Sequence, residues 1–230
     1  MIKKIAIFII TTLTLVGNVN AASDGELLLK KNDPSEIKEC WEGFNRASFA
    51  LNQGLDKIIF KPVASVYRTL PSPVKTGVSN SLNNLSNVVT IPNNLLQGEF
   101  SKAGDNTIRF IINTTFGILG FIDVANYIGL PKYEKEDYGQ TLAVHGLGPG
   151  CYLVLPVLGP TTARDAAGST LNFLGGDAWY NVTVQNDTKH FSDFDYYSSK
   201  ATAGVDFRAK NYDSINNVEK NSIDFYASVK

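Results

Sequence analysis

Few residues of this 230-residue chain have the types and spacing that enzyme chemistry requires. An activated serine needs a histidine to take its proton, commonly beside a G-x-S-x-G turn, and the sequence contains no such motif. The two histidines are His145, in a glycine-rich stretch, and His190, and neither belongs to an H-E-x-x-H zinc motif. We interpret His145 as a structural hydrogen-bonding residue, with catalysis or ligation as the alternative.

Two further patterns only partly resemble catalytic or phosphate-binding motifs. Glu134, Glu136 and Asp137 could do acid–base work, but a lysine-flanked acidic run is more typical of a solvated surface turn. The glycines of 146–150 have neither the Walker nor the dinucleotide-binding spacing, and Pro149 has no N–H to donate to a phosphate. The sequence therefore assembles no catalytic centre, and we expect neither a metal ion nor a cofactor.

Helical periodicity dominates the first half of the chain. Apolar or small residues recur in steps of three and four from Trp41 to Ile58, which predicts a long helix. Shorter amphipathic segments follow over 63–70 and 74–85, with prolines at their boundaries. Alternating strand patterns are scarce, so the sequence predicts an all-α fold.

The stretch from Ile108 to Ala125 is almost wholly apolar, but polar residues interrupt it and Gly117 and Gly120 divide it. This pattern is not that of a simple transmembrane helix and predicts a helical hairpin. On its residues alone, the hairpin either forms part of the core or dips part-way into lipid. Its candidates for membrane contact are Ile111, Ile112, Phe116, Ile118, Leu119 and Phe121.

Between Asp137 and Gly168 the chain is rich in glycine and proline and is predicted to be mostly loop. The run 152–158 fits a brief strand or an extended crossing, with Pro156 arguing against a central strand. Further helices are expected over 169–173 and 199–218.

The N-terminus has the features of a secretory signal peptide. Lys3-Lys4 precede an apolar run over 5–16 and a small, polar stretch that ends at residue 21, which predicts cleavage before Ala22. The run is shorter than the roughly 20 residues that cross a bilayer. A lipoprotein signal would place a cysteine after the apolar run, where Gly17-Asn18 stands. We therefore expect export without a lipid anchor and one domain over residues 22–230.

Charge and cysteine content narrow the class of protein further. Two of the 21 basic residues and none of the 22 acidic ones lie in the signal, so the mature chain carries 19 bases, 22 acids and a net charge of −3. That balance gives no electrostatic basis for binding nucleic acid. In an oxidising compartment, pairing is the simplest use for Cys40 and Cys151. Two buried, unpaired thiols fit equally well, because the sequence does not give the distance between their Cα atoms.

Five motifs occur in a fixed order over residues 40–168. They are Trp41-Glu-Gly-Phe-Asn-Arg46, Ile91-Pro-Asn93 with Leu96-Gln-Gly98, Arg109-Phe-Ile-Ile-Asn-Thr114, Gly117 to Ala125, and Asp137 to Asp165. Together they resemble the MlaA/VacJ family of outer-membrane lipid-asymmetry proteins, with a weaker match over 205–209.

The resemblance implies a ring-like arrangement of amphipathic helices on the periplasmic side of the bacterial outer membrane, around a polar channel and beside a porin trimer. Such proteins remove phospholipids misplaced in the outer leaflet and pass them intact to a soluble periplasmic carrier. A polar path is needed because a charged head group in hydrocarbon is strongly unfavourable. The apolar hairpin would be the lipid-embedded element. The channel candidates are the polar residues of the matched blocks: Asn45, Arg46, Asp123, Gln140, Arg164 and Asp165.

Two rival functions stay open, an envelope phospholipid hydrolase and a structural outer-membrane or cell-surface factor. A hydrolase predicts released fatty acid, a conduit predicts phospholipid moved intact, and a structural factor predicts neither. The chain departs from the family pattern in lacking the lipobox and in carrying Cys40 and Cys151 where relatives usually have prolines. It ends at Lys230, roughly where the family continues into a further turn or tail, so a truncated C-terminus is an open alternative.

Overall fold

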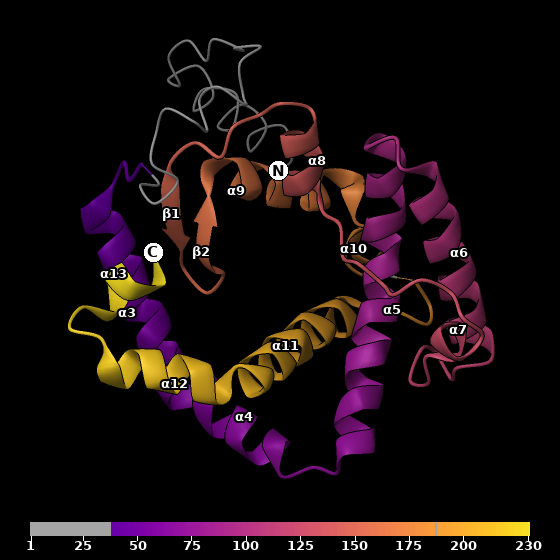
Figure 1. Cartoon of the computed structure of the whole chain (residues 1–230), viewed down its shortest axis with the longest axis horizontal. Coiled ribbons are helices and arrows are strands. Elements are labelled where there is room, and N and C mark those ends of the chain that lie inside the picture. Colours follow the sequence, from indigo (N-terminus) through magenta and orange to yellow (C-terminus); the bar gives the residue numbers. More distant parts are fainter. Residues whose placement is uncertain (1–37, 187) are drawn as a thin grey trace. The chain divides into compact units, whose positions relative to one another are not determined.

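Helices make up most of the secondary structure in the computed structural model, which describes residues 38–186 and 188–230 (Figure 1). The first seven are α3 (Glu42–Leu55), η1 (Asp56–Phe60), α4 (Lys61–Arg68), α5 (Ser72–Leu96), α6 (Phe100–Thr115), α7 (Val124–Tyr127) and α8 (Tyr138–Val144). The others are α9 (Ala163–Leu171), η2 (Asn172–Gly176), α10 (Ala178–Tyr180), η3 (Asn181–Gln185), α11 (Asp193–Lys210), α12 (Tyr212–Asn221) and α13 (Phe225–Val229). The predicted signal peptide lies outside the described residues, and the single domain expected over 22–230 stays a prediction.

A two-stranded antiparallel hairpin corrects the all-α expectation. It consists of β1 (Tyr152–Leu155) and β2 (Gly159–Thr162), with Tyr152 opposite Thr162 and Leu155 opposite Gly159. The four residues of β1 are aromatic, β-branched or leucine, which suits an extended strand, and Val157 and Gly159 turn the chain in left-handed conformations. The fold is therefore mostly helical with one small β-hairpin.

The helical path from α3 into α4 passes through Lys61-Pro62 without a break, so the boundary predicted there is wrong. An α-helical Pro62 would clash with the carbonyl four residues earlier and leave it without a donor. The π-helical turn η1 immediately precedes it, and its bonds span five residues, as in the N–H of Lys61 donating to the carbonyl of Asp56. A widened turn of this kind accommodates the missing donor.

Helix α5 also continues past the predicted end of its amphipathic segment, through Pro92, to Leu96. Tertiary contacts offset the hydrogen bond that Pro92 cannot make. Asn94 accepts a 2.8 Å bond from the Asn106 amide of α6, and the Asn84 amide donates a 2.8 Å bond to Thr114 of the same helix. Each such bond stabilises by about 1 kcal/mol net. Polar side chains thus hold the α5–α6 pair together.

The expected apolar hairpin is only half helical. Its first arm is the C-terminal half of α6, and its second arm is a tight turn followed by the single-turn helix α7. Ile118, Leu119 and Gly120 all have positive φ angles, which is unusual for Ile and Leu. Phe121 lies against Gly77 of α5, where a Cβ atom would overlap its ring. The turn is therefore packed onto α5 through Phe121, while its tip projects from the helices.

The segment predicted as loop between Asp137 and Gly168 contains α8 and most of α9. Asp137 caps α8 by accepting the N–H of Gln140 at 2.9 Å, and Thr162 caps α9 by accepting the N–H of Asp165 at 3.1 Å. Each cap stabilises its helix by about 1 kcal/mol. Both helices have little apolar periodicity, which is why the sequence pattern did not reveal them.

Within residues 38–230, the elements close into a ring (Figure 1). α3, η1 and α4 lead to α5, which packs against α8. α8 packs against α9, α9 packs against β2, and both strands contact α3, so the circuit is complete. α11 crosses it and contacts α4, α5 and η3.

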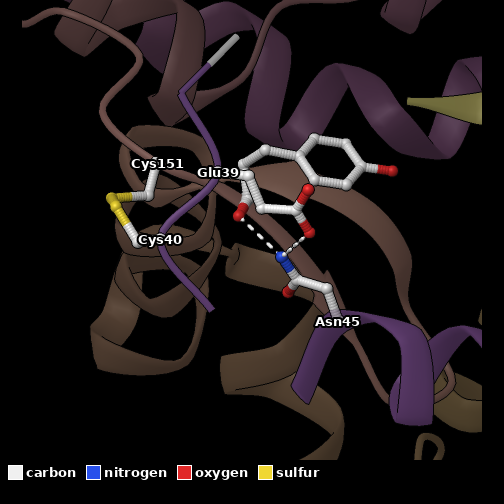
Figure 2. Close-up of a disulfide and its surroundings, with 5 residues drawn as sticks. Glu39, Cys40, Asn45 and Cys151 are labelled. Carbon is white, nitrogen blue, oxygen red and sulfur yellow. Dashed lines mark hydrogen bonds between the residues drawn. A yellow bond between two sulfur atoms is a disulfide. The ribbon is translucent and has the colours of Figure 1, made fainter. Parts of the chain in front are cut away.

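The junction between α3 and the β-hairpin is held by polar and covalent links (Figure 2). The structure joins Cys40 to Cys151 in a disulfide with Cα atoms 5.6 Å apart. Asn45, fully buried, donates to the carbonyl of Tyr152 at 3.1 Å and accepts from the N–H of Val154 at 2.9 Å. Beside it, a small apolar cluster of Tyr152, Val154 and Tyr226 packs with Phe49.

The distribution of polar and apolar side chains is the reverse of that in an ordinary globular protein. Among the residues that the structure describes, sixteen polar or charged side chains are buried against eight apolar ones. Many large apolar side chains are exposed instead, on η1, α4, α6, the turn after α6, and η2. An apolar surface of this extent marks contact with a membrane or a partner.

Candidate functional site

A cavity of about 450 Å³ lies between α5, α8, α9, α10 and α11. Its volume falls within the range of about 300–1,000 Å³ typical of ligand sites. Leu82, Leu85 and Val89 of α5 form an apolar side. The polar side is lined by Lys135, Asp137, Gln140, Arg164, Asp165, Asn172, Asp177 and Lys200. The cavity is therefore amphipathic, with cations and carboxylates close together.

Two short ion pairs organise the charges of this central cavity. The Nε of Arg164 donates to Asp165 at 2.8 Å, and the Nζ of Lys200 lies 3.4 Å from Asp177. Asp177, almost fully buried, also caps α10 by accepting the N–H of Trp179 at 2.9 Å. Burial, together with the Asp177 carboxylate, raises the pKa of Tyr138, which donates to the carbonyl of Gly176 at 2.9 Å. These groups bring both signs of charge to the cavity.

Glycines allow the two helices on one side of the cavity to approach closely. A Cβ atom at Gly168 of α9 would overlap the backbone of Gly139 at the start of α8. A Cβ atom at Gly139 would meet the side chain of Asp165. The close approach therefore requires glycine at both positions and places Gln140 and Asp165 at the cavity together.

The six predicted channel residues fall into two groups. Gln140, Arg164 and Asp165 line the central cavity, whereas Asn45, Arg46 and Asp123 lie elsewhere. Asn45 holds α3 to β1. Arg46 forms an exposed pair with Asp224 at 2.9 Å and lies 4.5 Å over the Tyr226 ring.

Asp123 supports the turn after α6. It accepts hydrogen bonds from Arg109 at 2.7 Å and from Asn113 at 2.9 Å, and it caps α7 through the N–H of Asn126. Arg109 is itself buried and also donates to the carbonyl of Pro131 at 2.7 Å. This network fixes the base of the turn, so Asp123 has a supporting role in the structure.

Five of the six predicted membrane-contact residues are exposed. Phe116, Ile118 and Leu119 are 75%, 69% and 72% exposed, and Ile111 and Phe121 are exposed to a lesser degree. Ile112 is half-buried. The apolar tip thus faces away from the protein interior, and no described helix is both long enough and apolar enough to span a bilayer.

The residues considered for catalysis do not form one cluster, and each has a different structural role. The Nε2 of His145 donates to the carbonyl of Leu96 at 3.0 Å, next to the end of α5. Glu134 is exposed, Glu136 accepts from Gln97 at 3.1 Å, and Asp137 caps α8. Residues 38–186 and 188–230 contain no group of acidic, histidine and cysteine side chains arranged to bind a metal ion.

Several cavity residues were missed from the sequence, including Asn172, Asp177, Trp179, Lys200 and Ala203. They lie on η2, α10 and α11 or, for Asp177, immediately before α10, and no matched motif includes these segments. One useful pattern was present nearby: buried polar residues recur on α5 in steps of three and four, at 84, 87, 90, 93 and 94. This polar stripe faces α6 and residues 133–141, not the cavity, so it would have predicted a polar helix contact and not the cavity lining.

The fold and the site define a helical ring protein with an amphipathic internal cavity and an apolar outer surface. The family model described as MlaA lipoprotein matches residues 37–230, and the chain belongs to this family. A protein of Escherichia coli (strain K12) named "Intermembrane phospholipid transport system lipoprotein MlaA" is 37% identical over 154 residues, which cover 65% of this chain and 59% of that protein.

A further relative and a solved structure are also similar to this chain. An uncharacterized protein of Rickettsia felis is 42% identical over 142 residues, covering 61% of this chain and 56% of that protein. The match to these relatives therefore spans less than two thirds of their length. A solved structure titled "Structural basis for maintenance of bacterial outer membrane lipid asymmetry" superposes with a TM-score of 0.67 at 31% identity, covering 84% of this chain and 93% of that one.

Proposed function

We propose that this protein is a non-enzymatic phospholipid conduit of the bacterial outer membrane. It takes phospholipids misplaced in the outer leaflet and passes them, intact, toward the periplasm, which maintains lipid asymmetry. The observation that carries the proposal is the combination of an amphipathic central cavity with an apolar outer surface.

The central cavity suits a phospholipid head group in transit. A zwitterionic head group carries a phosphate and an amine, and Arg164 and Lys200 lie near Asp165 and Asp177 to match both charges. A desolvated charge without partners is costly, and these side chains would replace part of its water shell. The apolar side formed by α5 tolerates the first carbons of the acyl chains.

The apolar turn after α6 supports attachment to the membrane. Its exposed tip carries Phe116, Ile118 and Leu119, and burying these side chains in lipid is favourable by about 25 cal/mol per Å² of apolar surface. We propose that this turn inserts part-way into one leaflet on the periplasmic side.

The family resemblance supports two partners, an outer-membrane porin trimer beside the ring and a soluble periplasmic carrier that receives the lipid. The exposed apolar side chains of η1 and α4 supply a surface large enough for a protein neighbour or for lipid. Purification of the tagged protein from cross-linked envelopes should recover a porin; recovery of no outer-membrane protein would contradict this partner.

The function is tested in a strain from which the gene is deleted. We expect phospholipid to accumulate in the outer leaflet, measured by accessibility to an external phospholipase, and to return to normal when the gene is restored. Unchanged outer-leaflet phospholipid in the deletion strain would reject the conduit.

The rival functions give different results with purified protein. Incubation with labelled phospholipid vesicles should release no fatty acid, whereas an envelope hydrolase would release it. Transfer of intact labelled lipid to acceptor vesicles containing the carrier distinguishes a conduit from a structural factor, which would transfer none.

A further inference from the structure

Two further cavities lie toward the C-terminal end of α11, beyond the part of that helix that lines the central cavity. One, of about 370 Å³, is lined by the end of α4, the first turns of α5 and the end of α11. The other is a groove of about 470 Å³ formed by Pro62, Val63, Val66, Tyr67, Leu70 and Val205. Tyr67 lines both, so the two cavities adjoin at this side chain.

The first cavity is basic. Arg68, Lys75 and Lys210 line it, and Asp206 is the one carboxylate in its lining. Asp206 is already engaged: Lys210 lies 2.8 Å from it, and the Tyr67 hydroxyl donates to it at 3.1 Å. Burial and this hydrogen bond raise the pKa of Tyr67 to about 12, so its hydroxyl stays a neutral donor.

Of the three cations that line the cavity, Lys75 is the one without an ion pair to a described residue. Its Nζ donates to the carbonyl of Arg68 at 3.0 Å. Arg68 forms a bidentate pair with Asp213, with bonds of 3.0 and 2.7 Å, and that carboxylate is 73% exposed. An anion entering this basic cavity would therefore gain charge-assisted hydrogen bonds without displacing a buried partner.

The groove beside it is apolar. Val63 and Val66 of α4 point into it although Val66 is 70% exposed. An extended hydrocarbon chain would cover these side chains and remove their surface from water. The basic cavity and the apolar groove together are complementary to a molecule with an anionic end and an apolar chain.

We propose that the basic cavity and the apolar groove bind one phospholipid with a net negative head group. Its phosphate lies between Lys75, Arg68 and Lys210, and one acyl chain lies along Val63 and Val66. The site goes beyond the proposed function, because occupancy requires no passage through the central cavity. The surplus of positive charge favours an anionic over a zwitterionic head group.

The test uses purified full-length protein and a phosphatidylglycerol analogue with a photoreactive group in one acyl chain. We expect labelling of the peptide that carries residues 62–70, identified by mass spectrometry. Lys75→Gln should reduce this labelling, with the apparent Kd raised roughly tenfold, whereas Lys75→Arg should retain it. Lys220→Gln is the matched control, since Lys220 lies exposed on α12 and lines none of these cavities.

Competition identifies the head group. Excess short-chain phosphatidylglycerol should abolish the labelling, and the same excess of phosphatidylcholine should leave most of it. Equal labelling of the Lys75→Gln and Lys220→Gln variants would overturn the proposal, as would labelling that never reaches residues 62–70. Neither result bears on the outer-leaflet measurement, so this site and the conduit can fail independently.

Discussion

Asn45 shows how a single buried polar residue joins distant parts of this chain. Its amide group donates to the carbonyl of Tyr152 and accepts from the N–H of Val154, which satisfies two backbone groups of β1 from α3. Asn52 makes the same kind of paired contact two turns further along the same face of α3, to the carbonyl of Leu155 and the N–H of Val157. Two asparagines of α3 thus bond to the backbone of β1 and of the turn that follows it.

Replacing Asn45 by leucine should destabilise the fold strongly. The change leaves two buried backbone groups without partners, at about 1–3 kcal/mol each. We expect Asn45→Leu to lower the free energy of unfolding in urea by about 3 kcal/mol. Asn52→Leu is the matched control and should cost less, because Asn52 is only half-buried and water can replace its bonds. Equal losses in the two variants would contradict this account.

Glu39 makes the same region sensitive to acid. Burial opposes ionisation of its carboxyl group, but hydrogen bonds from Lys230, Tyr226 and Asn45 outweigh it and lower the pKa of Glu39 from 4.5 to about 2. A lowered folded-state pKa stabilises the fold above the unfolded pKa, and this contribution is lost as the pH falls from about 4.5 toward 2.

We therefore expect wild type and Glu39→Gln to differ in unfolding free energy at pH 7 and to converge as the pH approaches 2. Urea unfolding followed by circular dichroism at pH 7, 4 and 3 measures the difference. Glu134→Gln, at an exposed site, should give no such convergence. A constant gap between wild type and Glu39→Gln across this range would exclude the proposed linkage.

At the scale of elements, the sequence predicted the helices with strong apolar periodicity and missed those set by caps. α3, α4 and α11 follow the expected periodic segments at least in part. α8 and α9 begin at the capping residues Asp137 and Thr162. Both helices lie in a glycine-rich segment, and Gly139 and Gly168 allow them to pack closely. Local composition could not distinguish this use of glycine from a loop.

The candidate site could be predicted only where its residues belong to the matched motifs. Gln140, Arg164 and Asp165 reach the central cavity, but Lys200 and Asp177 reach it from segments with no recognised pattern. Asn45, Arg46 and Asp123 lie in matched motifs and away from that cavity. A motif residue that supports the fold and one that lines a cavity look alike in a sequence, because only tertiary packing separates them.

The disulfide ties the segment before α3 to the start of β1 and should add to the stability of the ring. Cys40 and Cys151 are 111 residues apart, and closing a loop of that size stabilises by up to about 4.7 kcal/mol in the chain-entropy model. Cys40→Ser combined with Cys151→Ser should lower the unfolding midpoint in urea, and a reducing agent should shift wild type alone. Labelling of both cysteines in unreduced, denatured protein would show that the bond does not form.

A substitution in the apolar turn after α6 can test membrane contact without disturbing the fold. Leu119 has a φ of 55°, a region that Asp and Asn adopt more readily than Leu, so Leu119→Asp should not harm the turn. A charge inserted to mid-bilayer costs about 2.5–3.5 kcal/mol and less near the interface. We expect weaker membrane association and higher outer-leaflet phospholipid for Leu119→Asp, with Leu119→Asn as the uncharged control.

His145→Gln tests whether lipid clearance depends on a reactive side chain. The variant and wild type are compared at equal protein levels. A glutamine amide can still donate to the carbonyl of Leu96, and a conduit needs no proton transfer, so lipid clearance should stay near wild type. If folded His145→Gln lost phospholipid clearance while Leu119→Asp kept it, the enzyme hypothesis would be favoured over the conduit.

Over the whole described unit, many polar side chains are buried and many apolar side chains are exposed. The stability of such a fold therefore depends on what covers its apolar surface. Buried asparagines and arginines replace the large apolar core that a ring enclosing a cavity cannot form. Exposed apolar side chains on η1, α4, α6 and the turn are unfavourable in water and favourable against hydrocarbon. The same arrangement that holds the cavity open therefore also directs the ring to a membrane.

If lipid passes through the central cavity, filling that cavity should block transport without detaching the protein. Ala203 lines it from α11, and Ala203→Trp would place an indole ring in the path. Ala201, two residues earlier on the same helix, is exposed and lines none of the cavities described above, so Ala201→Trp makes the same substitution outside the path. We expect Ala203→Trp to raise outer-leaflet phospholipid to the level of a deletion strain and Ala201→Trp to behave as wild type.

Both variants should fractionate with the outer membrane, because the apolar turn is unchanged. Normal lipid clearance by folded, membrane-bound Ala203→Trp would show that phospholipid takes another route, and the apolar groove on α4 would then be the next path to obstruct.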